Sequence, residues 1–320
     1  MSHYVVTGGA GFIGSAIVRR LLKEGAGRVV VIDNLLTGHE ANLEEVRRAI
    51  DFQRADIRNY EEIAPLIRGA AVVFHEAAIP SVPRSIDDPV PSHEININGT
   101  FNVLRAAHEG KAGRVVYAAS SSAYGDTLVL PKVESMAPRP KSPYALQKLV
   151  GEYYCSVFSS VYGLETVALR YFNVFGPRQD PTSQYAAVIP NFITALVAGR
   201  RPVIFGDGEQ SRDFTYVSNV VDANLLAIDA PGVAGQVFNV ACGRRVTLNH
   251  LVGELRELLG ADVEPVYAEP RAGDIKHSLA DLKAARVRLG YEPAVALREG
   301  LQRTIEHLRT AETAGGLVRA

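Results

Sequence analysis

The feature that most constrains the fold is a regular alternation of short apolar strands with helical segments over the first half of the 320-residue chain. The strand-like runs HYVVTG, RVVVID and AAVVFHEAA are separated by segments with helical spacing, one of them around ANLEEVRRAI. Strands that are apolar along their whole length are typical of a parallel sheet covered on both faces. We therefore expect an α/β fold, a Rossmann-type doubly wound parallel sheet.

The local composition of the sequence changes near Pro177, where turn-forming residues become frequent. Two later strand-like pieces, FTYV and QVFNVA, are expected to return to the sheet. The rest predicts a smaller C-terminal α/β substrate lobe. The expected division is a dinucleotide-binding domain of residues 1–175 and 215–243, a substrate lobe of 176–214 and 244–310, and a frayed tail of 311–320.

Composition argues against several classes of function. The formal net charge of −1 gives no electrostatic reason to expect nucleic acid or an anionic membrane as a partner. No apolar run approaches the roughly 20 residues that span a bilayer, and the first residues do not resemble a signal peptide. Cys155 and Cys242 are far apart in sequence and the histidines are scattered, so we expect neither a disulfide framework nor a metal site. A cytoplasmic location is expected.

A glycine cluster stands between the first strand and the first helix. In VVTGGAGFIG, Gly9, Gly11 and Gly14 satisfy G-x-G-x-x-G, and Gly8 extends the pattern. Glycines at such a turn let a pyrophosphate approach the N-terminus of the helix. Asp33 ends the second strand, where a carboxylate can bind ribose hydroxyls and would repel a 2′-phosphate. No arginine follows directly, so the motif predicts NAD rather than NADP.

The segment SPYALQK predicts the start of another helix, with Ser142 as the N-cap and Pro143 at the first helical position. Tyr144 and Lys148 then lie one turn apart on the same face. Taken alone, this spacing fits two exposed side chains. It also fits a phenol whose pKa is lowered by an ammonium group, which would suit a proton shuttle.

Together these motifs resemble the extended short-chain dehydrogenase/reductase family, since ADI at 55–57 and Tyr-x-x-x-Lys accompany the glycine register. More narrowly, SVPRS, YAASSSAYGD, RYFNVFGPRQ, GDGEQSRDFTYV and PRAGDIKHS are similar to segments of the nucleotide-sugar 4-epimerases. The resemblance implies that Tyr144 is the catalytic base, that Lys148 binds the nicotinamide ribose, and that Ser120 bonds the reacting hydroxyl. The cofactor-binding residues that it implies, besides Tyr144 and Lys148, are Gly8, Gly11, Phe12, Ile13, Gly14, Asp33, Asn34, Asp56, Ile57 and Ala77.

The ordinary pKa of a tyrosine is near 10. Lys148, the cationic nicotinamide ring and the helix N-terminus are expected to lower the pKa of Tyr144 toward neutrality. A phenolate formed near neutral pH could then remove the proton of a sugar hydroxyl.

The type of reaction is indicated by Ser121 and Ser122, which could share the role of Ser120. The similar 4,6-dehydratases carry Asp and Glu at these two positions, and the related decarboxylases usually carry a Glu there. Hydroxyl groups are poor replacements for an acid and a base, whereas 4-epimerisation needs no further acid–base pair. Open alternatives are a UDP-glucuronate 4-epimerase, a reductase on the same fold and a non-catalytic NAD-binding regulator.

The resemblance also implies a UDP-sugar substrate, with dTDP left open. Relatives restricted to glucose and galactose carry a bulky Tyr where this chain has Ser278, so there is room for an N-acetyl group. We therefore expect UDP-N-acetylglucosamine and UDP-N-acetylgalactosamine ahead of plain hexoses, with uronic acids third. The implied substrate-binding residues are Arg84, Asn173, Val188, Phe205, Arg212, Arg271, Asp274 and Ser278.

His75, in FHEAA, is expected to be a structural residue rather than a proton carrier.

A homodimer is expected as well. Helices near 94–109 and 144–162 carry apolar residues on more than one face, among them Val150, Tyr154 and Phe158. Relatives pair these helices into a four-helix interface.

Overall fold

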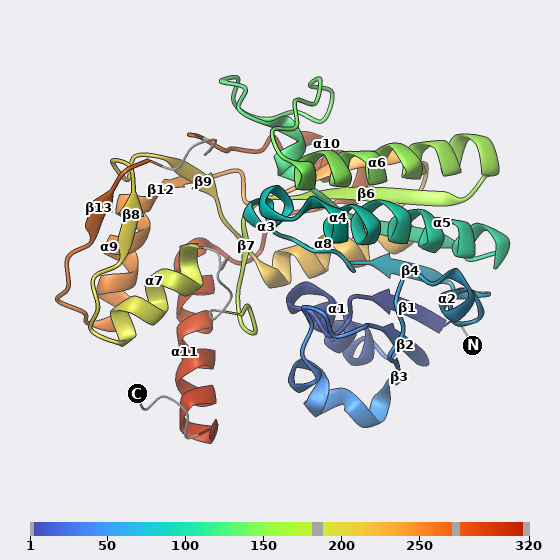
Figure 1. Cartoon of the computed structure of the whole chain (residues 1–320), viewed down its shortest axis with the longest axis horizontal. Helices are drawn as coiled ribbons and strands as arrows, with labels where there is room; N and C mark the ends of the chain where they lie inside the picture. Colours follow the sequence, from blue (N-terminus) through green and yellow to red (C-terminus); the bar gives the residue numbers. More distant parts are fainter. Residues whose placement is uncertain (1–2, 181–187, 271–275, 316–320) are drawn as a thin grey trace.

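The computed structural model describes residues 3–180, 188–270 and 276–315 (Figure 1). Its centre is a seven-stranded parallel sheet with the strand order β11-β6-β5-β4-β1-β2-β3. The strands of this sheet are β1 (His3–Thr7), β2 (Arg28–Ile32), β3 (Asp51–Gln53), β4 (Val72–His75), β5 (Arg114–Ser120), β6 (Glu165–Tyr171) and β11 (Gln236–Val240). The order reverses direction beside β1, which makes the sheet doubly wound as expected.

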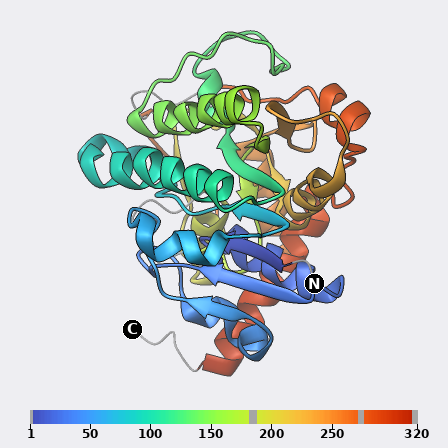
Figure 2. The same cartoon turned by 90° about the vertical axis from the view of Figure 1, so that its right-hand side faces the viewer.

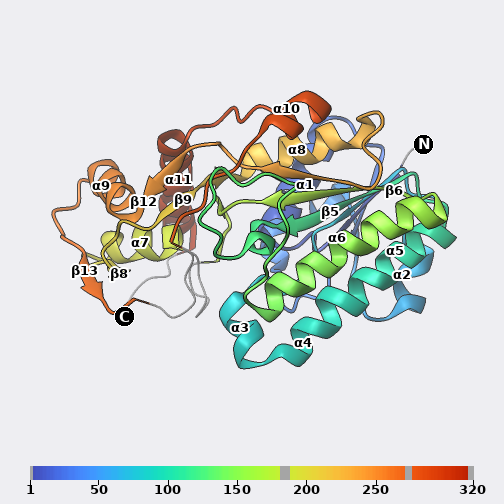
Figure 3. The same ribbon diagram turned by 90° about the horizontal axis from the view of Figure 1, so that it is seen from above.

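Helices cover both faces of the sheet, with the strands between the two layers (Figure 2). One face is covered by α1 (Phe12–Lys23) and α8 (Val217–Asp229), with α10 (Lys283–Leu289) beside α8, and the other by α2 (Tyr60–Ile67), α5 (Thr100–Glu109) and α6 (Pro143–Tyr162). Seen from above, α5 and α6 run side by side at the outside of the molecule (Figure 3). The short helices α3 (Val82–Asp87) and α4 (Pro89–His93) and a π-helical turn, η2 (Glu94–Gly99), lead into α5.

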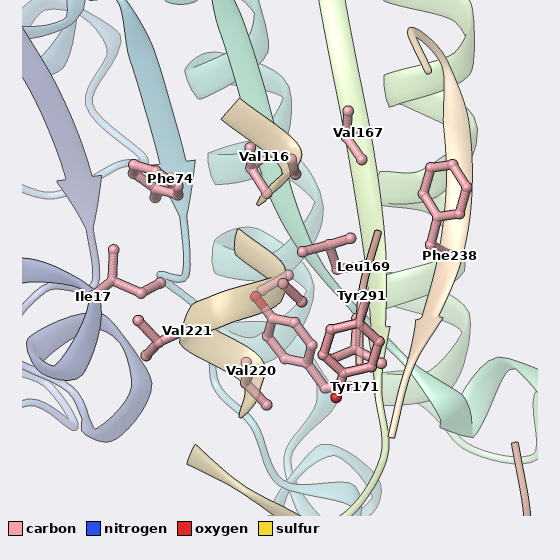
Figure 4. Close-up of a cluster of buried hydrophobic side chains, with 14 of the residues drawn as sticks. Ile17, Phe74, Val116, Val167, Leu169, Tyr171, Val220, Val221, Phe238 and Tyr291 are labelled. Atoms are coloured by element: carbon pink, nitrogen blue, oxygen red, sulfur yellow. The ribbon is translucent and has the colours of Figure 1, made fainter. Parts of the chain in front are cut away.

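The buried core follows from the apolar strands. Every residue of β4 is buried, and Phe74 packs with Val116 of β5, Leu169 of β6 and Ile17 of α1 on one side of the sheet (Figure 4). A separate apolar cluster fills the space between the sheet and α2, α5 and α6. Burial on both faces is the reason that these strands are apolar throughout rather than alternating.

A second lobe packs around its own apolar cluster, at the left of Figures 1 and 3. It contains α7 (Val188–Val197), α9 (Leu248–Leu259), α11 (Leu297–Gly315) and two small sheets, in which β8 (Val203–Phe205) pairs with β13 (Val266–Ala268) and β9 (Ser211–Asp213) pairs with β12 (Arg245–Thr247). In the described part of the chain, no helix is long and apolar enough to cross a membrane.

The helix expected around ANLEEVRRAI is present as a 3₁₀ helix, η1 (Glu40–Ala49), in which Leu43 is buried. One expectation about the fold was wrong. FTYV supplies β10 (Thr215–Tyr216), which pairs with β7 (Val174–Phe175) outside the main sheet, because the aromatic rings of both segments pack into the core of the second lobe. The helix α11 extends to Gly315, into the segment expected to be the tail.

Candidate active site

A cavity of about 750 Å³ lies along the carboxyl ends of the parallel strands, the edge where open α/β sheets bind their ligands. It gathers residues far apart in the sequence, from the turn after the first strand to the segment after residue 275. The predicted site residues in its wall are Gly8, Gly11, Phe12, Ile13, Gly14, Asp33, Asn34, Ile57, Ala77, Arg84, Ser120, Ser121, Ser122, Tyr144, Asn173, Arg212 and Ser278.

The glycine turn at one end of the cavity has no space for side chains. Gly8 has a φ of +70°, and a Cβ there would lie 2.6 Å from the backbone nitrogen of Ala77. A Cβ on Gly14 would lie 2.2 Å from the carbonyl oxygen of Gly8. The helix α1 begins directly after Gly11. A tight turn at a helix N-terminus fits the pyrophosphate of a dinucleotide.

Asp33 lies at the adjoining end of the wall, and its carboxylate is held in place by the backbone. Its Oδ2 accepts a hydrogen bond of 2.9 Å from the amide of Ala10, and Oδ1 accepts one of 2.8 Å from the amide of Leu35. Burial raises the pKa of Asp33, and these two hydrogen bonds oppose that shift. The fixed carboxylate fits the hydroxyls of a ribose.

Asp56, expected to bind the cofactor, does not line the cavity. It accepts a hydrogen bond of 2.8 Å from the side chain of Asn34, which does line it. The guanidinium of Arg58, hydrogen-bonded to Asp56, lowers the pKa of that carboxyl to about 2. Asp56 therefore orients Asn34, while its neighbour Ile57 contributes to the wall.

Tyr144 lies in the first turn of α6, and the expected capping is confirmed: the Ser142 hydroxyl accepts a hydrogen bond of 3.2 Å from the amide of Ala145. The amide of Tyr144 donates to the hydroxyl of Ser85, which ties the start of α6 to α3. Lys148, one turn later, is buried behind the cavity wall, where its Nζ donates a hydrogen bond of 2.8 Å to the carbonyl oxygen of Ala118. Helix and strand thus hold Tyr144 in the cavity wall and Lys148 behind it.

Ser120 is the last residue of β5, and the three serines are not equivalent. The Oγ of Ser120 accepts hydrogen bonds from the amide of Ser122, at 3.2 Å, and from its hydroxyl, at 2.8 Å. The side chain of Ser120 also lowers the pKa of Tyr144, whereas no such effect comes from Ser121 or Ser122. Ser120 is therefore the serine paired with the tyrosine, and Ser122 orients it.

The pKa of Tyr144 is shifted in the direction opposite to the expected one. Burial raises it and the negative charge of Glu76 raises it further, while the side chain of Ser120 lowers it. Burial also lowers the pKa of Lys148 to about 8. The protein alone therefore disfavours the phenolate, and the expected lowering has to come from the positive ring of the bound cofactor.

Sequence reasoning missed Glu76, which follows the last residue of β4 and lines the cavity. Its Oε1 accepts a hydrogen bond of 2.8 Å from the hydroxyl of Tyr171, and burial raises its pKa to about 7. The available signal was a carboxylate placed directly after a buried strand, in FHEAA.

The neighbouring His75 is structural, as expected. Its two ring nitrogens are hydrogen-bonded to the hydroxyls of Thr7 and Thr100, and burial lowers its pKa to about 3. The imidazole is therefore neutral at physiological pH. Within the described residues, no three His, Cys, Asp or Glu side chains are placed to hold a metal ion.

A second cavity of about 270 Å³ adjoins the first, because Asn173 and Arg212 line both. Val188 and Phe205, two of the predicted substrate residues, lie in its wall. Ser278 lies in the wall of the large cavity, where its amide donates a hydrogen bond of 3.0 Å to Ser211 of β9. Arg271 and Asp274 lie outside the described residues.

Comparison with known proteins identifies this arrangement. Residues 4–241 match the model of the NAD dependent epimerase/dehydratase family. The chain belongs to this family. The match confirms the expected family, Rossmann-type fold and cofactor, NAD, and the glycine turn and Asp33 described above fit that cofactor.

Individual relatives match along nearly their whole length. The UDP-glucose 4-epimerase of Mycolicibacterium smegmatis is 40% identical over 309 residues, which cover 95% of this chain and 98% of the relative. The UDP-N-acetylglucosamine 4-epimerase of Methanobrevibacter ruminantium, solved with UDP-N-acetylmuramic acid, has a TM-score of 0.92 at 40% identity, covering 97% of this chain and 98% of its own. The UDP-glucose 4-epimerase of Thermotoga maritima, solved with UDP-glucose, also has a TM-score of 0.92, at 39% identity and coverage of 97% and 99%.

Proposed function

We propose that this NAD-dependent nucleotide-sugar 4-epimerase interconverts UDP-N-acetylglucosamine and UDP-N-acetylgalactosamine. The observation that carries the choice of sugar is the small side chain of Ser278 in the wall of the large cavity. Similar enzymes restricted to glucose and galactose carry a tyrosine at that position. A serine leaves volume for an N-acetyl group, which has to fit in both orientations of the sugar.

Bound NAD would supply the oxidising power, by accepting the hydride from C4 of the sugar and returning it to the opposite face. Tyr144 takes the proton of the C4 hydroxyl as a general base and gives it back as a general acid. Ser120, oriented by Ser122, hydrogen-bonds the reacting oxygen. Lys148, held by the carbonyl of Ala118, binds the nicotinamide ribose and keeps positive charge beside Tyr144.

The two adjoining cavities suit a substrate that is held at one end and turns at the other. The nucleotide base lies in the smaller cavity against Phe205 and Val188, and the sugar lies in the larger one near Arg84. Arg212 and Asn173, which line both, hold the diphosphate, because a guanidinium can donate two parallel hydrogen bonds to phosphate oxygens. Arg271 and Asp274 are proposed to add contacts to the diphosphate and to the ribose.

The proposed division of labour follows the two lobes. Residues 1–175 and 215–243 bind NAD, and residues 176–214 and 244–310 hold the nucleotide sugar. A cytoplasmic location is proposed because Cys155 and Cys242 are both free thiols.

The proposed assembly is a homodimer formed through α5 and α6. Tyr153, Val157 and Val161 follow one another at four-residue spacing on α6, and their side chains are 56%, 45% and 67% exposed. Phe101 of α5, which packs beside Tyr154 of α6, is 39% exposed. A continuous apolar stripe on two adjacent helices is typical of an interface.

The variant Ser278→Tyr tests the choice of sugar. It is expected to abolish turnover of UDP-N-acetylglucosamine while UDP-glucose is still converted. The matched variant Ser278→Ala keeps the space and is expected to convert both sugars. Equal loss of both activities in Ser278→Tyr would contradict the proposed role.

A further inference from the structure

The carboxylate of Glu76 has no part in the steps above, although it lies in the wall of the same cavity. The hydroxyl of Tyr171, at the end of β6, donates a hydrogen bond of 2.8 Å to its Oε1. Asn224 of α8 donates a hydrogen bond of 2.8 Å to the Tyr171 oxygen, which leaves the tyrosine proton directed at the carboxylate. The side chain of Glu76 is therefore fixed rather than free in the cavity.

The position of this pair in the sheet places it beside the reacting groups. β5 lies between β4 and β6, so the contact between Glu76 and Tyr171 spans the end of the strand that carries Ser120. Tyr171 belongs to the apolar cluster on the α1 and α8 side of the sheet, near Val220 (Figure 4). Tyr144 and Lys148 come from α6, on the other side. The end of the cavity that contains Ser120 and Tyr144 thus has α6 on one side and the Glu76–Tyr171 pair on the other.

The groups that face Glu76 come from α6, β6, α8 and the preceding residue. Lys148 of α6 is the cation that it faces, and Tyr144 of the same helix feels its negative charge. Tyr171 donates to it from β6, and α8 presents only the uncharged Asn224. His75, the preceding residue, is neutral. Among the described residues, no hydrogen bond reaches Oε2, the second carboxylate oxygen.

We propose that Glu76 is the counter-charge of the cofactor: its carboxylate, fixed by Tyr171, faces the cationic nicotinamide ring and favours oxidised over reduced NAD. The proposal rests on the proposed function in one respect, the placement of the nicotinamide beside Tyr144. The proposed chemistry of the sugar is unchanged, since a hydride and a proton leave the sugar and both return to it.

This counter-charge has a use in epimerisation. The ring loses its positive charge when it takes the hydride, so a nearby anion makes the reduced cofactor less favourable. The keto-sugar then spends less time waiting for the hydride to return and is less often lost from the cavity. One close charge in a protein interior shifts such an equilibrium by about tenfold or more, or about 30 mV for a two-electron couple.

The test is a redox titration of the holoenzyme against a dye couple, with the reduced cofactor measured by its near-ultraviolet absorbance. Glu76→Gln has the same shape and still accepts the hydrogen bond from Tyr171. At about pH 9 it is expected to hold at least tenfold more reduced cofactor than the wild type at the same dye potential. The difference should shrink at about pH 5.5, where the wild-type carboxylate is itself protonated. Equal titrations at the higher pH, or a difference independent of pH, would overturn the proposal.

Two further measurements separate charge from structure. Tyr171→Phe removes the anchor and keeps the charge, so its increase in reduced cofactor should be well below that of Glu76→Gln. An equal increase would contradict the proposal. If Glu76→Gln does not fold, the wild type alone provides the test. Its bound cofactor should become easier to reduce, relative to free NAD, as the pH falls through about 7. A difference in reduction potential between bound and free NAD that stays the same at every pH would count against the proposal. No nucleotide sugar is used, so a wrong substrate assignment cannot cause either failure.

Discussion

Lys148 of α6 donates a hydrogen bond of 2.8 Å to the carbonyl oxygen of Ala118 on β5. This contact joins the helix that carries Tyr144 to the strand that carries Ser120, two residues after Ala118. Since burial removes Lys148 from solvent, its ammonium group is held by the backbone rather than by water. The relative positions of Tyr144, Lys148 and Ser120 are therefore determined by the packing of α6 on the sheet.

Tyr144→Phe removes the proposed proton carrier and leaves the ring in place. We expect kcat to fall about 10²- to 10⁴-fold, the usual contribution of a general acid–base group, with NAD still bound. Steady-state kinetics and the cofactor content of the purified variant provide the measurement. Nearly wild-type kcat would remove Tyr144 from the mechanism.

Much of the site was predictable because strand ends and glycine turns have strong local signatures. Gly8 and Gly14 are required by backbone geometry after the first strand, Asp33 follows the second strand, and the structure brings all three into one wall. The Ser142 cap was predictable for the same reason, because it depends only on its neighbours in sequence.

Features that depend on tertiary contacts were not predictable. Glu76 meets Tyr171 across 95 residues of sequence, and the pKa of Tyr144 is set by burial and by Glu76 rather than by the nearby Lys148. Thr215–Tyr216 leaves the main sheet because its aromatic neighbours pack elsewhere. Sequence patterns show which residues are apolar, and they do not show which element covers them.

Arg212→Gln tests the proposed diphosphate contact. A hydrogen bond to a charged group contributes about 1.5–3 kcal/mol, so we expect the Kd for UDP to rise about 10- to 100-fold. Isothermal titration calorimetry with UDP measures this directly. Lys23→Gln, which removes an exposed charge at the end of α1, serves as the control and should leave the Kd unchanged.

Val157→Lys places a charge in the centre of the exposed stripe on α6. We expect sedimentation velocity to show the wild type as a dimer at micromolar concentration and this variant as a monomer. Val287→Lys on α10 is the matched control, because Val287 is exposed outside the stripe, and it should remain dimeric. A monomeric wild type would refute the proposed interface.

The low pKa of the buried His75 makes the free energy of unfolding depend on pH. Its pKa is about 3 in the folded protein and about 6.5 when unfolded, so below about pH 6.5 the unfolded state binds a proton that the folded state does not. Stability from this group is therefore lost as the pH falls from about 6.5 toward 3, by about 2 kcal/mol at pH 5.

The raised pKa of Glu76 acts in the opposite direction over part of this range, so His75→Asn is needed to isolate the imidazole. Urea unfolding should show that this substitution destabilises the protein at about pH 7.5, and by about 2 kcal/mol less at pH 5. A cost that is the same at both pH values would show that the imidazole is not held neutral.

The central claim, reversible inversion at C4 of an N-acetylated UDP-sugar, is tested most directly by NMR of the holoenzyme with UDP-N-acetylglucosamine deuterated at C4. The account predicts UDP-N-acetylgalactosamine that keeps the deuterium at C4, because the same hydride leaves and returns. Product that has lost the label, or a wild-type enzyme that converts only UDP-glucose or UDP-glucuronate, would contradict it.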